Sequence, residues 1–153
     1  MIKGELKKMI QLIVFQANEL KNKYIPDDKS AVNYAAIFSQ SDNEFNDLLS
    51  EIKEIGVVIL ETKTGPLFKI DSLDTVAGSL KIVKIRKPDR TRLERGDADF
   101  TVKNYNEFKN EFLGKKGFKL IERDNFEMIE LMESGFNVRT YFSNPPLDVQ
   151  LKI

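Results

Sequence analysis

Two aspartates separated by one residue are the first candidates for chemistry in this chain. Asp97 and Asp99 lie in the run Asp-Ala-Asp-Phe-Thr-Val (97–102), and alternate residues of a strand point to the same face of a sheet. These two carboxylates would then share one face with Thr101, while the apolar residues between them pack on a helix. Carboxylates held close together repel one another, so one can retain its proton and act as an acid. Together with Glu127 they form the predicted catalytic set.

A basic connector precedes these aspartates and could hold an acidic ligand. It runs from Lys87 to Gly96. Its basic residues, together with Arg86 just before it, are Lys87, Arg90, Arg92 and Arg95, and Asp89 and Glu94 lie among them. Guanidinium groups bind carboxylates and phosphates through two parallel hydrogen bonds, so the connector predicts a clamp for such a group. The alternative is a solvated loop whose arginines pair with Asp97 and Asp99, since structural ion pairs are common near such sites. Both interpretations stay open at this point.

Three side chains of the predicted strands could donate hydrogen bonds to a ligand oxygen, namely Tyr34, Arg139 and Tyr141. A shift of one residue in register moves a side chain to the other face of a sheet. Alternation alone does not fix the register of residues 137–143, so it does not fix the face that Arg139 takes.

The composition removes several classes of chemistry. The 153 residues contain no histidine and no cysteine, so disulfides, thiolate sites and imidazole catalysis or ligation are excluded. The 24 basic and 24 acidic residues balance, which argues against a nucleic-acid partner. The chain lacks the ~18 consecutive apolar residues of a membrane span, and its charged N-terminus is not a signal peptide. We therefore expect a cytoplasmic protein without a membrane partner.

The elements that must position these residues follow from hydrophobic periodicity. Residues 1–26 carry an apolar stripe at three- and four-residue spacing, which predicts an amphipathic helix. Residues 32–89 then predict a βαβββ module, and residues 97–146 predict a second one. Expected strands are 32–39, 57–61, 67–70, 80–86, 97–102, 118–122, 126–132 and 138–142. A ferredoxin-like fold is the alternative, but it needs a second helix near Leu73–Gly78.

The second module carries sequence pieces that resemble the glyoxalase/bleomycin-resistance (vicinal oxygen chelate) superfamily. These pieces are Asp-Ala-Asp-Phe-Thr-Val (97–102), Tyr-Asn-Glu-Phe (105–108), Gly-Phe-Lys-Leu-Ile-Glu-Arg (117–123), Phe-Glu-Met-Ile-Glu-Leu (126–131) and Tyr-Phe-Ser-Asn-Pro-Pro (141–146). The first module resembles the family more faintly. The resemblance implies an α+β protein whose two βαβββ modules form a glyoxalase-like cup, with the N-terminal helix as an addition.

The resemblance also implies where a metal would bind. Members chelate a divalent metal with a histidine on the first strand of a module and a glutamate on its last strand. The matching positions here are Asn33 and Asp97, and residues near Val83 and Thr140, so neither ligand type is present. A hard cation could still bind oxygen atoms, but two ligands are too few for a tight site. We therefore expect no cofactor. Candidate ligand-binding residues are Asn33, Arg86, Arg95, Arg139, Thr140 and Tyr141.

Three functions remain open on this reading. The first is metal-independent binding of a small molecule in the cup. The second is a lyase or isomerase that acts on a small oxyacid through Asp97, Asp99 or Glu127. The third is a protein-interaction module. The N-terminal helix predicts either a cover for an open sheet or the contact of a homodimer.

Overall fold

One eight-stranded sheet dominates the computed structural model of the chain, which describes residues 4–153. The strands are β1 (Ala31–Phe38), β2 (Gly56–Thr62), β3 (Gly65–Thr75), β4 (Gly78–Arg86), β5 (Gly96–Thr101), β6 (Phe118–Glu122), β7 (Glu127–Leu131) and β8 (Val138–Asn144). The helices are α1 (Glu5–Tyr24), α2 (Asp42–Ile52), α3 (Tyr105–Phe112) and α4 (Leu147–Gln150). The strand order across the sheet is β2-β3-β4-β1-β5-β8-β7-β6.

The chain repeats one topology. The first module is β1-α2-β2-β3-β4, and the second is β5-α3-β6-β7-β8. In each module the first strand pairs in parallel with the last, as in Ala35 with Val83 and Ala98 with Thr140. The modules join through the antiparallel pair of β1 and β5. This confirms the predicted α+β fold of two βαβββ modules behind an N-terminal helix.

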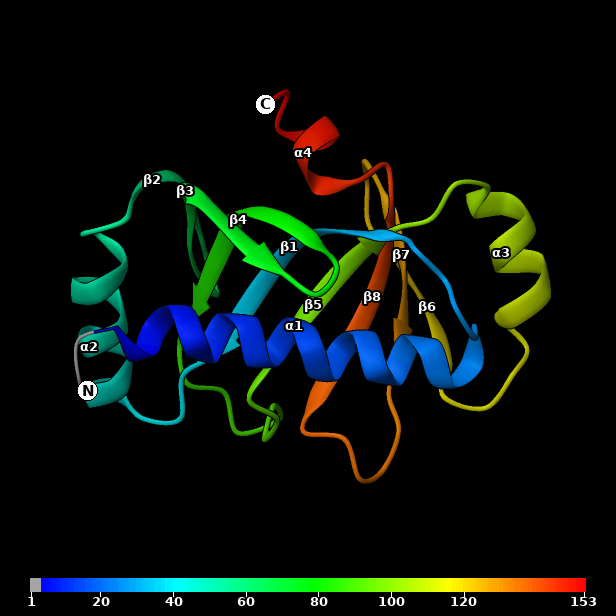
Figure 1. Cartoon of the computed structure of the whole chain (residues 1–153), viewed down its shortest axis with the longest axis horizontal. Coiled ribbons are helices and arrows are strands. Elements are labelled where there is room, and N and C mark those ends of the chain that lie inside the picture. Colours follow the sequence, from blue (N-terminus) through cyan, green and yellow to red (C-terminus); the bar gives the residue numbers. More distant parts are fainter. Residues whose placement is uncertain (1–3) are drawn as a thin grey trace.

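Helix α1 covers one face of the sheet and spans both modules (Figure 1). Its apolar stripe is buried and packs on β1, β3, β5 and β8. Fully burying one such side chain contributes about 1.5–3 kcal/mol, so the stripe ties the two modules together. The stripe consists of Leu6, Ile10, Ile13, Val14, Ala17 and Leu20. No helix within residues 4–153 combines the length and apolarity that a membrane crossing requires.

The hairpin of β3 and β4 is longer than the sequence predicts. We expected a strand over 67–70 followed by a loop, whereas β3 continues to Thr75 and pairs Leu73 with Leu80. An irregularity in the pairing between Lys69 and Leu73 breaks the alternation that would have revealed one long strand. Because β3 and its turn occupy residues 73–78, the helix that a ferredoxin-like fold needs is absent there.

The chain continues past Pro146, where the sequence predicted the end of the second module. Residues 145–153, here called the C-terminal arm, include the short helix α4. The backbone N–H of Asp148 donates a hydrogen bond of 3.1 Å to Oδ1 of Asn33 on β1. Figure 1 shows α4 following β8 near the junction of the two modules. The arm thus lies against the face of the sheet that α1 leaves open.

Candidate functional site

The strands sort their side chains onto two faces. Ala98 and Phe100 of β5, and Val83 and Ile85 of β4, belong to the core on the α1 side. The residues that alternate with them face the opposite side, which we call the cavity face. Gly96 allows β5 to lie close to β1 and to α1, because a Cβ there would sit 2.2 Å from the carbonyl oxygen of Ala36 and 2.8 Å from Cδ1 of Ile13.

The cavity face holds a central cavity of about 310 Å³. Both modules, the connector and the C-terminal arm contribute to it, so it exists only because the modules are joined. Its polar lining is Tyr34, Thr62, Lys84, Arg86, Arg92, Asp97, Arg123, Tyr141 and Gln150. Its apolar lining is Leu60, Leu67, Ile121, Phe126, Met128, Leu147 and Leu151.

Positive charge predominates in the central cavity. Its lining contains four basic side chains, Lys84, Arg86, Arg92 and Arg123, and one carboxylate, Asp97. In the sheet, both Lys84 and Asp97 pair with Ala36 of β1, so they lie two strands apart on one face. Two interstrand spacings correspond to roughly 10 Å between their Cα atoms. The cations and the carboxylate therefore border one space without filling it.

Asp97 is the most unusual group of the cavity. Its side chain belongs to a residue only 5% exposed, and Oδ1 has no hydrogen-bond partner. Burial raises the pKa of Asp97 to about 6, although Arg92, Arg86 and Lys84 act to lower it. Burying a carboxylate without a full set of partners costs free energy. The protein contacts of Asp97 do not offset this cost.

Arg86 is also incompletely paired. Its Nε is buried without a hydrogen-bond partner, and its Nη2 lies 3.7 Å from Oδ2 of Asp89. The guanidinium groups of Arg86 and Arg92 lie 5.7 and 5.2 Å from the ring centre of Phe38, which holds both cations at the cavity without neutralising them. Burial lowers the pKa of Arg86, with the charge of Arg92 adding to this effect.

Lys84 is the third cation of this group. Its Nζ donates a hydrogen bond of 2.6 Å to Oγ1 of Thr64. Burial, followed by the charge of Arg86, lowers the pKa of Lys84 to about 8. At neutral pH the lysine is still largely protonated, so it contributes to the positive charge of the cavity.

Two predicted ligand-binding residues, Arg139 and Tyr141, lie on the cavity face in a saturated network. Arg139 donates to Oε1 of Glu94 at 3.0 Å, to Oε2 of Glu130 at 3.3 Å and to the carbonyl oxygen of Thr91 at 3.1 Å. The Tyr141 hydroxyl donates to Oε2 of Glu130 at 2.6 Å. Tyr141 lines the central cavity, whereas Arg139 is occupied by its own protein partners.

Asp99 lies on the same face as Asp97 but is fully buried below the cavity lining. It accepts hydrogen bonds from the backbone N–H of Ser143 at 3.3 Å and from the Ser143 hydroxyl. Burial raises the pKa of Asp99 to about 7, the Ser143 hydroxyl acts against this, and the charge of Asp97 adds to it. The predicted pair of carboxylates therefore consists of one group at the cavity and one tied to the protein.

The predicted site residues Thr140 and Glu127 lie away from the central cavity. Thr140 points to α1, where its hydroxyl donates to the carbonyl oxygen of Ala17 at 2.9 Å. Glu127 binds the side chains of α3, accepting from the Tyr105 hydroxyl at 2.8 Å and from Nζ of Lys109 at 2.9 Å.

Arg95 is likewise engaged elsewhere. Its two terminal nitrogens contact the two oxygens of Glu44 at 2.8 and 2.9 Å. The same guanidinium lies 3.0 Å from Sδ of Met9 in α1. Arg95 thus fixes α2 to the start of β5, and unlike Arg86 it is not among the residues that line the central cavity.

Lys84 was not among the predicted site residues, and Arg92 was considered only as part of the connector. The signal for Lys84 was present in the alternation of Lys84 and Arg86 with Val83 and Ile85. Because the valine and isoleucine belong to the hydrophobic core on the helix-covered face, the two basic residues must face the cavity. No pattern in the sequence indicated that Leu147, Gln150 and Leu151 of the C-terminal arm line the cavity.

The side chains at the predicted metal positions do not fit a divalent metal. Oδ1 of Asn33 already accepts the hydrogen bond from Asp148, and Asp97 stands among cations. Within residues 4–153, no three carboxylates gather closely enough to hold a metal ion. Calcium and magnesium are bound largely by carboxylates, and the lining of the central cavity holds one carboxylate among four basic side chains.

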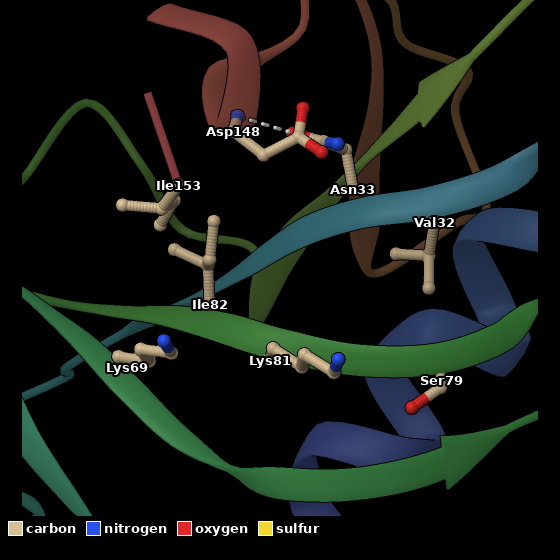
Figure 2. A pocket seen from close by; sticks show the side chains of 8 residues that line it. All are labelled: Val32, Asn33, Lys69, Ser79, Lys81, Ile82, Asp148 and Ile153. Atoms are coloured by element: carbon tan, nitrogen blue, oxygen red, sulfur yellow. Dashed lines mark hydrogen bonds between the residues drawn. The ribbon is translucent and has the colours of Figure 1, made fainter. Parts of the chain in front are cut away.

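A second hollow, the side cavity, lies on the other side of the C-terminal arm and measures about 320 Å³. Figure 2 shows its lining, with the hydrogen bond between Asp148 and Asn33 at one end and Lys69 and Lys81 near the other. Both lysines are exposed. None of its lining residues has a buried polar atom without a partner, so the central cavity is the better candidate site.

Comparison with solved structures shows the fold. The chain is similar to a structure described as Structural Genomics, Protein EC4020, with a TM-score of 0.73 and 10% identity over 97% of this chain and 90% of that one. This likeness concerns the fold alone. No protein-family model matches the sequence, and no curated protein matches it.

Weaker likenesses are found to two other structures. One is a glyoxalase/bleomycin resistance protein/dioxygenase superfamily member from Vibrio splendidus 12B01, with a TM-score of 0.42 and 6% identity over 72% of this chain and 94% of that one. The other is methylmalonyl-CoA epimerase from Mycobacterium tuberculosis, with a TM-score of 0.41 and 9% identity over 74% and 86%. These TM-scores are too low to assign a function.

Proposed function

We propose that this protein binds a small anionic organic molecule in the central cavity without a metal. The observation that supports this most directly is the group of cations Lys84, Arg86 and Arg92 around a cavity whose lining holds a single carboxylate. Arg86 has a buried Nε with no partner. A carboxylate or phosphate would supply the missing acceptor, and such charge-assisted hydrogen bonds are among the stronger ones in proteins.

The apolar part of the lining sets a second requirement. Apolar side chains from β2, β6 and the C-terminal arm, such as Leu60, Ile121 and Leu151, line the same cavity as the cations. Binding pockets of this size are generally apolar with a few polar groups that orient the ligand. The ligand is therefore an amphiphile with one acidic group and a short apolar body.

The same cavity supports a divergent kinship with the glyoxalase superfamily as part of this proposal. The paired βαβββ topology supports it, and so does the position of Asn33 and Asp97 on the two central strands. In this hypothesis arginine and lysine side chains perform the ligand binding for which other members use a metal.

Titration calorimetry with caproate, in the presence of a chelator, tests the binding proposal. We expect saturable binding that the Arg86→Gln variant weakens by about tenfold or more, because a charge-assisted hydrogen bond is lost. Lys81→Gln is the matched control, since it removes a positive charge from the side cavity only. Equal affinities for the wild type and Arg86→Gln, or no binding of any acid, would contradict the proposal.

A second candidate, acid–base catalysis on a small oxyacid, is favoured by two titratable groups in one cavity. The pKa of Asp97 is raised to about 6 and that of Lys84 is lowered to about 8, so both lie near neutral pH, where proton transfer is most effective. Proton NMR in D₂O would detect exchange of the C–H group next to the carboxylate of a bound acid. Exchange that Asp97→Asn abolishes would support catalysis, whereas bound acids without exchange leave a binding protein.

A further inference from the structure

We infer that the bound acid carries a hydroxyl or ammonium group next to its acidic group, and that Asp97 is the residue that selects for this hydrogen-bond donor. The inference rests on the proposed function, because it concerns the ligand of the same cavity. It adds a specificity-determining role for one side chain and a chemical class for the ligand.

The first step is that Asp97 differs from the other carboxylates of the cavity face. Asp99 is bound by Ser143. Glu130 accepts from Arg139 and from the Tyr141 hydroxyl. Oδ1 of Asp97, in contrast, has no partner although the residue is just as buried. The other two buried carboxylates on this face have hydrogen-bond donors from the protein. Asp97 lacks one among the described residues, so we infer that its donor comes from a ligand.

The second step concerns the cations near Asp97. Their charges lower its pKa, yet in the described part of the chain no lysine or arginine nitrogen forms an ion pair with it. Arg92 instead donates to the Tyr141 hydroxyl at 3.3 Å, and Lys84 to Thr64. Arg92 and Lys84 are thus engaged by other contacts rather than by Asp97. The space between them can receive a ligand that contacts both.

The third step is that Asp97 discriminates between acids. A plain carboxylate that binds to Arg86 and Lys84 brings a second negative charge close to Asp97, which is unfavourable. A hydroxyl or ammonium group on the neighbouring carbon offers a donor instead. Rotation about the Cβ–Cγ bond exchanges the two oxygens of Asp97, so either oxygen can accept it. A buried acceptor left without its donor is the strongest basis for rejecting an analogue that lacks the donor.

Three acids that share one carbon chain test this inference. Caproate has no donor, α-hydroxycaproate carries a hydroxyl group and norleucine carries an ammonium group beside the carboxylate. Calorimetry at pH 8 measures the affinity of each for the wild type, for Asp97→Asn and for Asp148→Asn. The last variant is the matched control, because it neutralises a carboxylate of the side cavity.

We expect the wild type and Asp148→Asn to bind at least one donor-bearing acid about tenfold or more tightly than caproate. In Asp97→Asn the preference should fall severalfold, while caproate binds at least as well as before. Preference for norleucine alone would identify the donor as an ammonium group, and preference for α-hydroxycaproate as a hydroxyl group. Circular dichroism confirms that the variant is folded.

Equal affinity of the wild type for all three acids would overturn the inference, and so would a preference that Asp97→Asn retains. Either result leaves the proposed function intact as long as caproate binding depends on Arg86. The absence of binding by every acid, in contrast, removes the proposed function and this inference together. The two failures are therefore distinguishable in one experiment.

Discussion

Two arginines, Arg86 and Arg139, lie on the last strands of the two modules and face the same side of the sheet, yet their surroundings differ. Arg139 on β8 binds three acceptors, two of them carboxylates, at 3.0 to 3.3 Å. Arg86 on β4 has a carboxylate oxygen at 3.7 Å and a buried Nε with no partner. Each of the three guanidinium nitrogens of Arg139 has a protein acceptor, so this arginine holds the protein together, whereas the unpartnered buried Nε of Arg86 is available to a ligand.

The same contrast extends to the modules as wholes. On the cavity face of the second module, Glu130, Tyr141 and Asp99 are joined to protein partners. On the first module, the side chains of Lys84 and Arg86 line the cavity and form no close ion pair with the described residues that share its lining. The two βαβββ modules thus differ on the cavity face: the second has a saturated polar network, the first has unused binding capacity, and Asp97 lies where the two meet.

The largest effect should come from breaking this network. Removal of the charge in Arg139→Gln leaves the buried Glu130 and the half-buried Glu94 with fewer partners. Breaking a buried ion pair by removing one partner typically costs about 3–5 kcal/mol, so we expect a loss of about 3 kcal/mol in the free energy of unfolding. For Arg86→Gln we expect a change of at most about 1 kcal/mol, since few contacts are lost. Urea denaturation of both variants measures the difference.

Equal destabilisation by the two substitutions would contradict the division into a structural and a ligand-binding arginine. Glu94→Gln provides a check on the mechanism, because it removes one of the carboxylates that Arg139 contacts. Its effect and that of Arg139→Gln should not add in the double variant, as expected for residues of one network.

Local sequence signals were sufficient for most of the fold. The apolar stripe of α1 fixes which face of the helix is buried, and Ser41 caps α2 by accepting from the backbone N–H of Glu44 as a capping residue should. Alternation placed Asp97 and Asp99 on the face opposite Phe100. The extension of β3 was missed because the irregular pairing between Lys69 and Leu73 interrupts that alternation.

The partners of the site residues could not be predicted, because they come from distant parts of the chain. Arg95 is paired with Glu44, 51 residues away in sequence, and Ser143 binds Asp99 across 44 residues. Sequence shows that an arginine or aspartate is present but not whether another element satisfies it. The face taken by Thr140 likewise depends on register, which the pairing of β5 with β8 determines.

A smaller effect should follow from neutralising Asp97, and it should depend on pH. The pKa of Asp97 is raised to about 6 in the folded protein, above its ordinary value of 3.8. The folded state therefore binds this proton more tightly than the unfolded state, so the carboxylate destabilises the fold increasingly as pH rises from 4 through 6. The charged and titratable groups that face Asp97 are Tyr34, Lys84, Arg86, Arg92, Asp99, Arg139 and Tyr141.

We expect Asp97→Asn to be more stable than the wild type by roughly 1–3 kcal/mol at pH 8 and close to it at pH 4, from about 1.4 kcal/mol per pKa unit. Thermal unfolding of both proteins across this pH range provides the measurement. A variant less stable than the wild type at pH 8 would show that Asp97 is a structural residue like Asp99, and the contrast between the two aspartates would disappear.

The smallest effect concerns the C-terminal arm, which separates the two cavities on the cavity face. Oδ1 of Asn33 accepts the backbone N–H of Asp148, so Asn33→Ala should release the start of α4 from β1. One hydrogen bond contributes about 0.5–1.5 kcal/mol, and we expect the loss to be local, with amide exchange accelerated in residues 147–151 and unchanged in β5 and β8. Hydrogen exchange followed by mass spectrometry resolves these segments.

Acceleration that spreads into β8 would mean that the arm is part of the saturated network of the second module. Exchange confined to the arm would instead assign it to the side of the molecule that is built to admit a ligand, since Leu147, Gln150 and Leu151 line the central cavity.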